Sequence, residues 1–292
     1  MRVLVAGILH SDSGKTVLAA SLTRTIIREG FVATASKPLG ATDLMEHPEV
    51  LARTRQARVV VTWDGYVLHV ASGGRLPIEV VNPVGALLAP TLLSRHGGWS
   101  SFEATLSQSY RRAVLVRATA CTGESRSIHF VNSDALTRVN RYVSESVEDV
   151  ASYLNPGPVK AGDEAVAGLF SGGGAATADT CLAMAESVSD VIVIESNSSV
   201  AAPTLRSAYP DIAIIVSYGE AYLVDGMRFS RALEALALAG KPWVASSVEV
   251  LQLTGSLERV ELPLLDDPDE GYPSEVLQPI VEKVKARAKP SG

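Results

Sequence analysis

The sequence predicts an α/β fold in which a mainly parallel sheet is sandwiched by helices in three layers. Short apolar runs that fit buried strands alternate with helical patterns along most of the chain. The 292 residues are 47% hydrophobic and 20% charged, which supplies material for a large core. No linker convincingly divides the sequence, so we expect one domain over 1–292 with an insertion around 57–175.

The first elements are expected in the order strand, loop, helix, strand. Residues 2–9, RVLVAGIL, form an apolar run typical of a buried strand. Residues 15–30 carry apolar side chains at helical spacing and end at a glycine, where a helix C-cap is expected. Residues 31–36 then predict a second strand, which leads into Lys37.

The middle of the chain is less regular. Asp64-Gly65 stands between two β-rich runs, which is a strong hairpin signal, so we expect an inserted β-hairpin over 57–74. Further strands are expected at 78–90 and 111–120, and an amphipathic helix at 141–154. The glycine-rich stretch 171–177 is interpreted as a flexible loop or a helix start rather than a second phosphate site, because no lysine follows it.

From residue 177 the alternation of helix and strand returns. The pattern predicts a helix through 180–188, strands at 190–195 and 211–217, a helix at 227–238, a strand at 241–247 and a last helix at 273–287. The two cysteines, Cys121 and Cys181, lie far apart in sequence and fit neither a disulfide framework nor a metal cluster. We therefore expect both to be ordinary core or surface residues.

Charge and hydropathy narrow the choice of partners. The net charge is −6 and no basic run occurs, so neither nucleic acid nor an anionic membrane is an expected partner. No apolar stretch reaches the roughly 18–20 residues of a membrane span. The first residues feed directly into a glycine loop and are interpreted as a strand rather than a signal peptide. We expect a cytoplasmic protein that binds small molecules or proteins.

The stretch AGILHSDSGKT, residues 6–16, has most features of a phosphate-binding loop. The pattern G-x-x-x-x-G-K-[ST] asks for glycine where Leu9 stands, but the loop joins a strand to a helix as the motif requires. Backbone N–H groups and the helix dipole make such a loop an anion site. Lys15 would contact the β- and γ-phosphates and Thr16 would bind Mg²⁺. The expected nucleotide-binding residues are His10, Ser11, Asp12, Ser13, Gly14, Lys15, Thr16 and Val17. A chance Gly-Lys-Thr at a helix start is the alternative.

Acidic residues that could complete a magnesium site follow predicted strands. A Mg²⁺ ion held by a threonine hydroxyl usually needs a carboxylate at the end of a neighbouring strand. Glu195, which ends the run DVIVIE, is the best candidate, and Asp43 in KPLGATD is a second. An acidic residue at a strand end can also occur by chance.

The loop resembles that of the dethiobiotin synthetase family, Gly-Thr-Asp-Thr-x-Val-Gly-Lys-Thr, which aligns with residues 8–16. The likeness continues in chain order with Lys37-Pro38, then with Val-Asn-Pro and a later proline in 81–90. The family's element Glu-Gly-Ala-Gly-Gly-Leu-Leu-Val-Pro has the length of ESNSSVAAP, 195–203. The sequence also resembles archaeal proteins described as P-loop ATPases or GTPases. Both groups belong to the P-loop NTPase class that includes the MinD-like ATPases.

This resemblance implies a P-loop NTPase fold, and it implies that Lys37, with Lys15, takes part in catalysis by facing the substrate or the γ-phosphate. Lys37 leaves a strand end on the loop's edge of the sheet, although a solvated lysine there is an alternative. Ser196, Asn197, Ser198 and Ser199 replace the family's glycines, so we expect a different, polar substrate. Tyr218, Asp225, Ser246 and Ser247 stand where the family recognises the base, and relatives imply a homodimer.

The sequence therefore predicts Mg²⁺-dependent nucleotide binding with hydrolysis or phosphoryl transfer. ATP is favoured over GTP because no guanine-reading Asn-Lys-x-Asp is present. Activation of a small polar carboxylate or carbamate would fit this chemistry. Two alternatives stay open: a nucleotide-dependent switch that acts on a protein partner, and a module that binds nucleotide without turnover.

Overall fold

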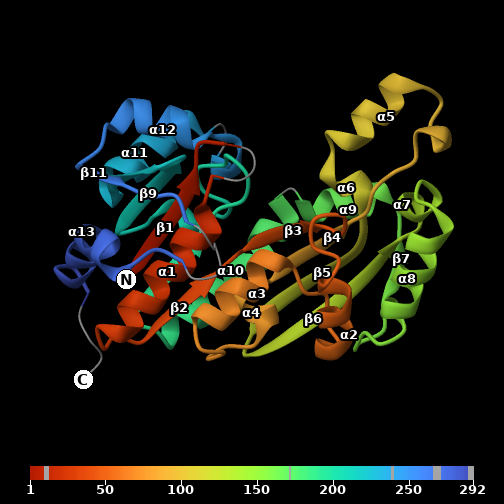
Figure 1. The fold of residues 1–292 in the computed structure, drawn as a ribbon, viewed down its shortest axis with the longest axis horizontal. Helices are drawn as coiled ribbons and strands as arrows, with labels where there is room; N and C mark the ends of the chain where they lie inside the picture. Colours follow the sequence, from red (N-terminus) through yellow and green to blue (C-terminus); the bar gives the residue numbers. More distant parts are fainter. Residues whose placement is uncertain (10–12, 171, 238–239, 266–270, 289–292) are drawn as a thin grey trace. The chain divides into compact units, whose positions relative to one another are not determined.

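The computed structural model describes residues 1–292 apart from 10–12, 171, 238–239, 266–270 and 289–292. The predicted α/β class is confirmed, although helices flank two mixed sheets instead of one mainly parallel sheet (Figure 1). The chain divides into two compact units, each described by itself. Unit 1 comprises 1–38, 67–81 and 182–292, and unit 2 comprises 39–66 and 82–181.

Unit 1 is built on a sheet with the strand order β11-β10-β9-β1-β8-β2 among the described residues. The strands are β1 Arg2–Gly7, β2 Ala33–Ser36, β8 Val191–Glu195, β9 Ile212–Ser217, β10 Glu220–Asp225 and β11 Glu258–Glu261. The four strands β9, β1, β8 and β2 are parallel, and β10 and β11 extend the sheet in antiparallel pairing. Val3–Ala6 are fully buried in β1, as a strand covered on both faces requires.

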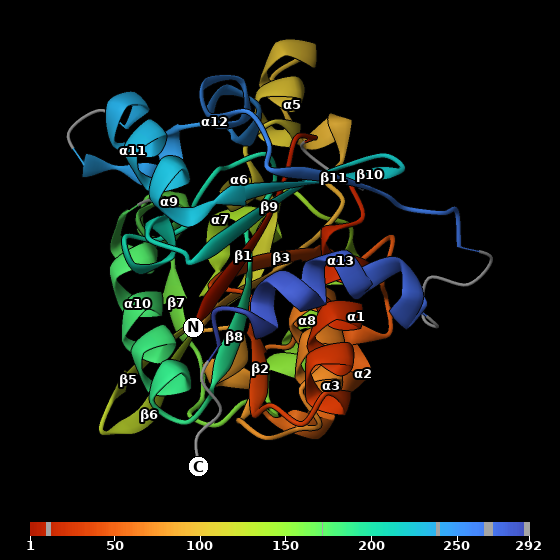
Figure 2. The same ribbon diagram turned by 90° about the vertical axis from the view of Figure 1, so that its left-hand side faces the viewer.

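Helices cover both faces of the unit 1 sheet. Figure 2 shows α1 and α13 together on one side of the sheet and α11 and α12 on the other. Their bounds are α1 Lys15–Arg28, α11 Gly226–Leu236, α12 Ser247–Thr254 and α13 Ser274–Lys285. The shorter elements are α4 Ile78–Val81 and the 3-10 turns η2 Arg206–Ala208 and η4 Pro242–Val244. The helix α13 buries an apolar stripe formed by Leu277, Ile280, Val281 and Val284.

The connections that leave β1 and β8 run in opposite directions along the strand order. These strands are parallel neighbours, yet β1 continues through α1 to β2, beyond β8, whereas β8 is followed by β9, beyond β1. In open α/β sheets a ligand crevice forms at the carboxyl ends of strands whose connections diverge in this way. The carboxyl ends of β1 and β8 are therefore the place in unit 1 where a ligand is expected.

Unit 2 is built on a second mixed sheet, with the strand order β3-β4-β5-β6-β7 among the described residues. The strands are β3 Leu39–Asp43, β4 Val84–Leu88, β5 Ala113–Thr122, β6 Glu124–Asn132 and β7 Val159–Ala161. The helices are α2 Val50–Ala57, α5 Trp99–Leu106, α6 Ser109–Arg112, α7 Ser133–Thr137, α8 Arg141–Ala151 and α9 Asp163–Phe170, with the 3-10 turn η1 Leu93–Arg95. Figure 1 shows α5 extending away from the rest of unit 2.

The strand β4 and the first half of β5 are buried on both faces of the unit 2 sheet. Leu87 and Leu115 pack with residues of α2 and α8, whereas Leu88 and Val116 pack with Val166 of α9. Two further helices contain boundaries between the units: α3 Trp63–Ala71, at 66/67, and α10 Gly172–Ser187, at 181/182. The glycine-rich stretch 171–177 is thus a helix start from Gly172 onward, as one of the two interpretations predicts.

The prediction for the cysteines is wrong. Cys121, near the end of β5, and Cys181, in α10, form a disulfide with a Cα–Cα distance of 4.7 Å. Both residues are buried and belong to unit 2. Their separation of 60 residues in sequence hides the contact, because it arises from packing of α10 on the β5–β6 hairpin.

The predicted hairpin over 57–74 is also wrong, since Trp63–Ala71 forms α3. Asp64 lies in the first turn of this helix, and the Thr62 hydroxyl accepts a hydrogen bond from the Gly65 N–H. A side chain at Gly65 would lie 2.7 Å from Asn82 Cβ, so the glycine serves close packing and not a turn. The hairpin of unit 2 is formed by β5 and β6.

Two predicted strands need correction. Only Val84–Leu88 of the predicted strand at 78–90 is a strand, and Ile78–Val81 is α4. The predicted strand at 241–247 is a 3-10 turn followed by the start of α12. Pro242 cannot donate to a ladder, and Ser246 forms a capping box with Glu249 that starts the helix.

Candidate functional site

Gly7, at the end of β1, lies close to the side chains of Ser13 and Lys15. A Cβ atom built on Gly7 would lie 2.2 Å from Ser13 Oγ and 2.9 Å from Lys15 Nζ, so a larger residue there would displace these side chains. Lys15 is 7% exposed, and its ammonium group donates to Ser13 Oγ over 2.9 Å. His10, Ser11 and Asp12, which the sequence predicts to bind nucleotide, lie outside the described residues.

Gly14 caps α1 in the left-handed conformation, with a φ of 77°. Among the described residues no side chain caps this terminus, and the first turn, which holds Lys15, Thr16 and Val17, contains no acidic residue. The first turn of α1 therefore adds no carboxylate of its own to the positive end of the helix dipole. Among the described residues the loop presents one ammonium group and the amino end of a helix, which together favour an anion.

Glu195 ends β8 beside β1 and connects two of the predicted site residues. Its Cα pairs with that of Val5, and its side chain is 1% exposed. The Thr16 hydroxyl donates to Glu195 Oε1 over 2.9 Å, and Lys37 Nζ donates to the same oxygen over 2.5 Å. One carboxylate oxygen thus holds together side chains from α1, β8 and the end of β2.

Hydrogen bonds hold both the backbone and the side chain of Lys37. Its backbone N–H donates to the carbonyl of Val81 over 2.8 Å, which anchors the residue where β2 ends. Its side chain is 4% exposed, and Nζ also donates to the carbonyl of Ser196 over 3.1 Å. The ion pair with Glu195 thus places the Lys37 side chain at the same edge of the sheet as Lys15.

Residues 196–199 form a compact turn after β8. Ser196 Oγ donates to the carbonyl of Val200 over 2.5 Å, and the Val200 N–H donates to the carbonyl of Asn197 over 3.2 Å. Ser198 has a φ of 50°, an uncommon value for a residue with a side chain and one often found at functional sites. The Ser199 carbonyl accepts the Ser247 N–H over 2.9 Å, so this turn lies against the start of α12.

Asp43, the second predicted magnesium ligand, belongs to unit 2. Its carboxylate accepts hydrogen bonds from the Arg112 guanidinium and from the Met45 N–H. Its assigned partners are therefore a cation and an amide, and the metal role remains a prediction. In unit 1 the side chains of the predicted residues Thr16 and Lys37 meet at Glu195, and that of Lys15 meets Ser13.

Tyr272 is a site residue that the sequence analysis does not single out. A Cβ atom built on Gly14 would lie 3.6 Å from the Tyr272 hydroxyl oxygen. Burial raises the pKa of this phenol above its ordinary value. No local sequence pattern indicates the contact, because Tyr272 and Gly14 come from opposite ends of the chain.

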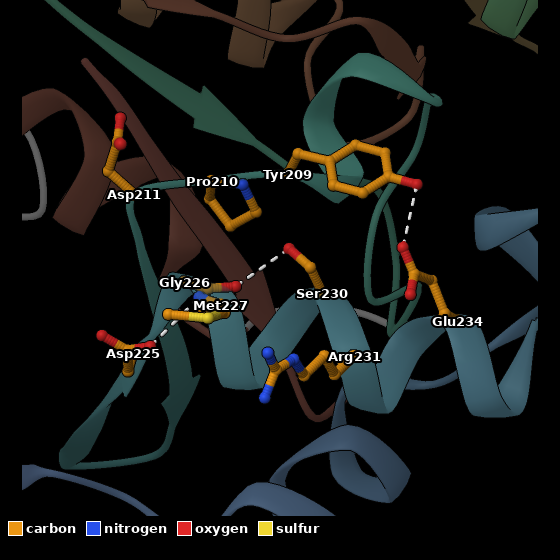
Figure 3. A pocket seen from close by; sticks show the side chains of 9 residues that line it. All are labelled: Tyr209, Pro210, Asp211, Asp225, Gly226, Met227, Ser230, Arg231 and Glu234. Carbon is orange, nitrogen blue, oxygen red and sulfur yellow. Dashed lines mark hydrogen bonds between the residues drawn. The ribbon is translucent and has the colours of Figure 1, made fainter.

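A separate cleft of about 500 Å³ lies at the opposite edge of the unit 1 sheet (Figure 3). It is lined by residues that precede β9 and by the start of α11, where Asp225 accepts the Met227 N–H over 3.1 Å. At its other end Tyr209 donates to Glu234 over 3.1 Å. Hydrogen bonding to this carboxylate raises the pKa of Tyr209. Asp225, predicted at the position of base recognition, lines this cleft, whereas Lys15, Thr16, Lys37 and Glu195 do not.

Among the described residues no group of three or more His, Cys, Asp or Glu side chains is placed to hold a metal ion. A site made of one hydroxyl, one carboxylate and solvent would not form such a group. None of the helices in the described ranges has the length and apolar character needed to cross a membrane.

Comparisons with known proteins add no family assignment. No protein-family model matches the chain, and no curated protein sequence matches it. The site itself combines the amino end of α1, the side chains of Lys15 and Lys37, and the hydrogen bond between the Thr16 hydroxyl and the Glu195 carboxylate.

Proposed function

We propose that this protein binds a magnesium-bound nucleoside triphosphate, preferably ATP, and hydrolyses it or transfers its γ-phosphoryl group to a small polar carboxylate or carbamate. The observation that carries the proposal is the contact of Thr16 and Lys37 with the single oxygen Glu195 Oε1. This contact lies one residue from Lys15, at the edge where the connections of β1 and β8 diverge.

The phosphates would bind at the amino end of α1. Successive N–H groups of the first turn, together with the helix dipole, stabilise negative charge there. The Lys15 ammonium is already inside the loop and would contact the phosphate oxygens. These groups stabilise the additional charge that develops during phosphoryl transfer.

Two oxygens would hold the magnesium ion. Thr16 Oγ1 and Glu195 Oε1 meet in a hydrogen bond of 2.9 Å, and a hydroxyl and a carboxylate are oxygen ligands of the kind that Mg²⁺ prefers. A bound magnesium ion would neutralise charge on the β- and γ-phosphate oxygens. Asp43 is a second candidate ligand from the sequence alone.

Lys37 would serve the acceptor side of the reaction. The Lys37 ammonium, which contacts Glu195 Oε1, would attract an anionic oxygen of the acceptor. The serine-rich turn 196–199 lies next to it and brings polar side chains to the acceptor side. A carboxylate or carbamate has the negative charge and the nucleophilic oxygen that this environment suits.

Calorimetric titration with ATP and GTP, each with and without Mg²⁺, tests the proposal. We expect magnesium-dependent binding, tighter for ATP, that weakens by roughly 10- to 100-fold in K15A because a charge-assisted contact is lost. K160A is the matched control, since Lys160 is an exposed lysine on β7 of unit 2. Equal binding by K15A and wild type, or no magnesium-dependent binding, would overturn the proposal.

Turnover is measured separately from binding. ADP formation should require Mg²⁺ and fall in K15A. Release of free phosphate in step with ADP indicates hydrolysis, whereas ADP formed in excess of free phosphate, on addition of a carboxylic acid, indicates transfer. Tight binding with no ADP formed under either condition would exclude the enzymatic part.

A further inference from the structure

The segment that precedes the last helix places a phenol beside the amino end of α1. The Tyr272 hydroxyl oxygen is 3.6 Å from the position that a Cβ atom on Gly14 would occupy. Gly14 is the residue that caps α1, so the phenol stands next to the first N–H groups of the helix. In the proposed function, these N–H groups bind the phosphates of the nucleotide.

The backbone at 271–272 is held against α1. Gly271 has a φ of 76°, and a side chain there would lie 2.3 Å from Ser21 Oγ. The Tyr272 N–H donates to the same Ser21 oxygen over 2.9 Å. The helix α13 then packs along α1 with a continuous buried stripe. The phenol is therefore positioned by contacts on both sides of it along the chain.

The Tyr272 hydroxyl is suited to donate to an anion. Within the described part of the chain it makes no hydrogen bond, although the side chain is half-buried. Burial raises the pKa of the phenol, so the group keeps its proton at physiological pH. A neutral O–H donor can contact a phosphate oxygen without adding a further positive charge beside Lys15.

We propose that the Tyr272 hydroxyl donates a hydrogen bond to a phosphate oxygen of the ligand at the amino end of α1. This inference rests on the proposed function and adds a recognition residue from the far end of the chain. It also assigns the contact to the phosphate chain and not to the base, because the hydroxyl lies at the helix cap.

Two probes with magnesium test the assignment: ATP, and inorganic tripolyphosphate, which has no base. Calorimetry on Y272F should show about tenfold weaker binding of both probes, since one charge-assisted hydrogen bond is lost. Y209F is the matched control, because Tyr209 loses the same oxygen at the opposite edge of the sheet. The tyrosine difference spectrum on adding magnesium tripolyphosphate should be present in wild type and Y209F and absent in Y272F.

The outcomes separate this inference from the proposed function. If K15A abolishes binding while Y272F binds both probes as wild type does, the role of Tyr272 is overturned and the nucleotide site stands. If Y272F weakens ATP but not tripolyphosphate, the phosphate contact is overturned. If wild type binds neither probe, both proposals fall. Equal urea-unfolding midpoints for Y272F and wild type exclude a loss of binding through unfolding.

Discussion

At the scale of single residues, the oxygen Glu195 Oε1 connects the side chains of the candidate site. It accepts hydrogen bonds from Thr16 and Lys37, and both Glu195 and Lys37 are almost completely buried. Removing one partner of a buried ion pair usually costs more than removing both, because a desolvated charge is left behind. We therefore expect a substitution in the Lys37–Glu195 pair to change the stability of unit 1 as well as the candidate site.

Comparison of E195Q with K37M/E195Q measures this link. We expect E195Q to lower the free energy of unfolding by on the order of 3 kcal/mol, since the Lys37 ammonium loses the carboxylate charge it contacts. Replacing both residues should restore most of this loss, because a methionine tolerates the apolar surroundings. Urea denaturation gives both values. Additive losses in the double variant would show that the two side chains do not interact.

Residue identities alone indicated part of the site. Thr16, Glu195 and Lys37 follow strands or start a helix, and such positions meet at one sheet edge once the strands are parallel neighbours. The disulfide and the contact of Tyr272 with the cap of α1 depend on tertiary packing across long stretches of sequence. No local pattern records such a contact, which is why sequence reasoning missed both.

At the scale of elements, the start of α11 shows how a capping carboxylate stabilises its helix. Asp225 accepts the N–H groups of Met227 and Arg228 and pairs with Arg287 over 3.0 Å. Burial would raise the pKa of Asp225, but the hydrogen bonds from Arg228, Arg287 and Met227 outweigh it, so the pKa is lowered. A carboxyl with a lowered folded-state pKa stabilises the fold above its unfolded pKa, and this contribution is lost as the pH falls through the folded value.

D225N should therefore be less stable than wild type at neutral pH, by about 1 kcal/mol, because the amide keeps the capping oxygen but loses the charge. The difference should shrink as the pH falls below about 4, where Asp225 of the unfolded chain and then of the folded protein becomes protonated. Urea unfolding at a series of pH values checks this. A difference that does not change with pH would show that the charge contributes nothing.

Elements with one dominant local signal were the ones predicted well. The apolar runs at β1, β2, β8 and β9 and the periodic stripes of α1, α8 and α13 match the structure within a few residues. The predicted hairpin was wrong because a residue that often marks a turn has another role. Gly65 lies in α3, and its missing side chain leaves room for Asn82. Short polar strands such as β7 and β11 carry no alternation that distinguishes them from loops.

At the scale of the whole molecule, the disulfide closes residues 121–181, nearly half of unit 2, into a covalent loop. The cysteines are 60 residues apart, and a loop of that length is expected to add about 4 kcal/mol to stability through the unfolded chain. C121S/C181S should lower the free energy of unfolding by about this amount. Urea denaturation of the variant and of wild type, without reductant, gives the comparison.

Thiol titration of the unfolded wild type provides the control. It should detect no free thiol before reduction and two after reduction, since Cys121 and Cys181 are the only cysteines of the chain. Wild-type protein with reactive thiols, or an unchanged stability in C121S/C181S, would contradict a stabilising disulfide.

The order of strands in unit 1 also determines when its sheet can form during synthesis. The neighbours of β1 are β8 and β9, which begin at Val191 and Ile212, so residues 8–190 must be made before β1 has either partner. At roughly 5–20 residues per second this takes on the order of 10–40 s. All of unit 2 has left the ribosome's catalytic centre by then. The apolar strand RVLVAG must therefore remain without its sheet partners, and avoid aggregation, while the segment that separates it from them is produced.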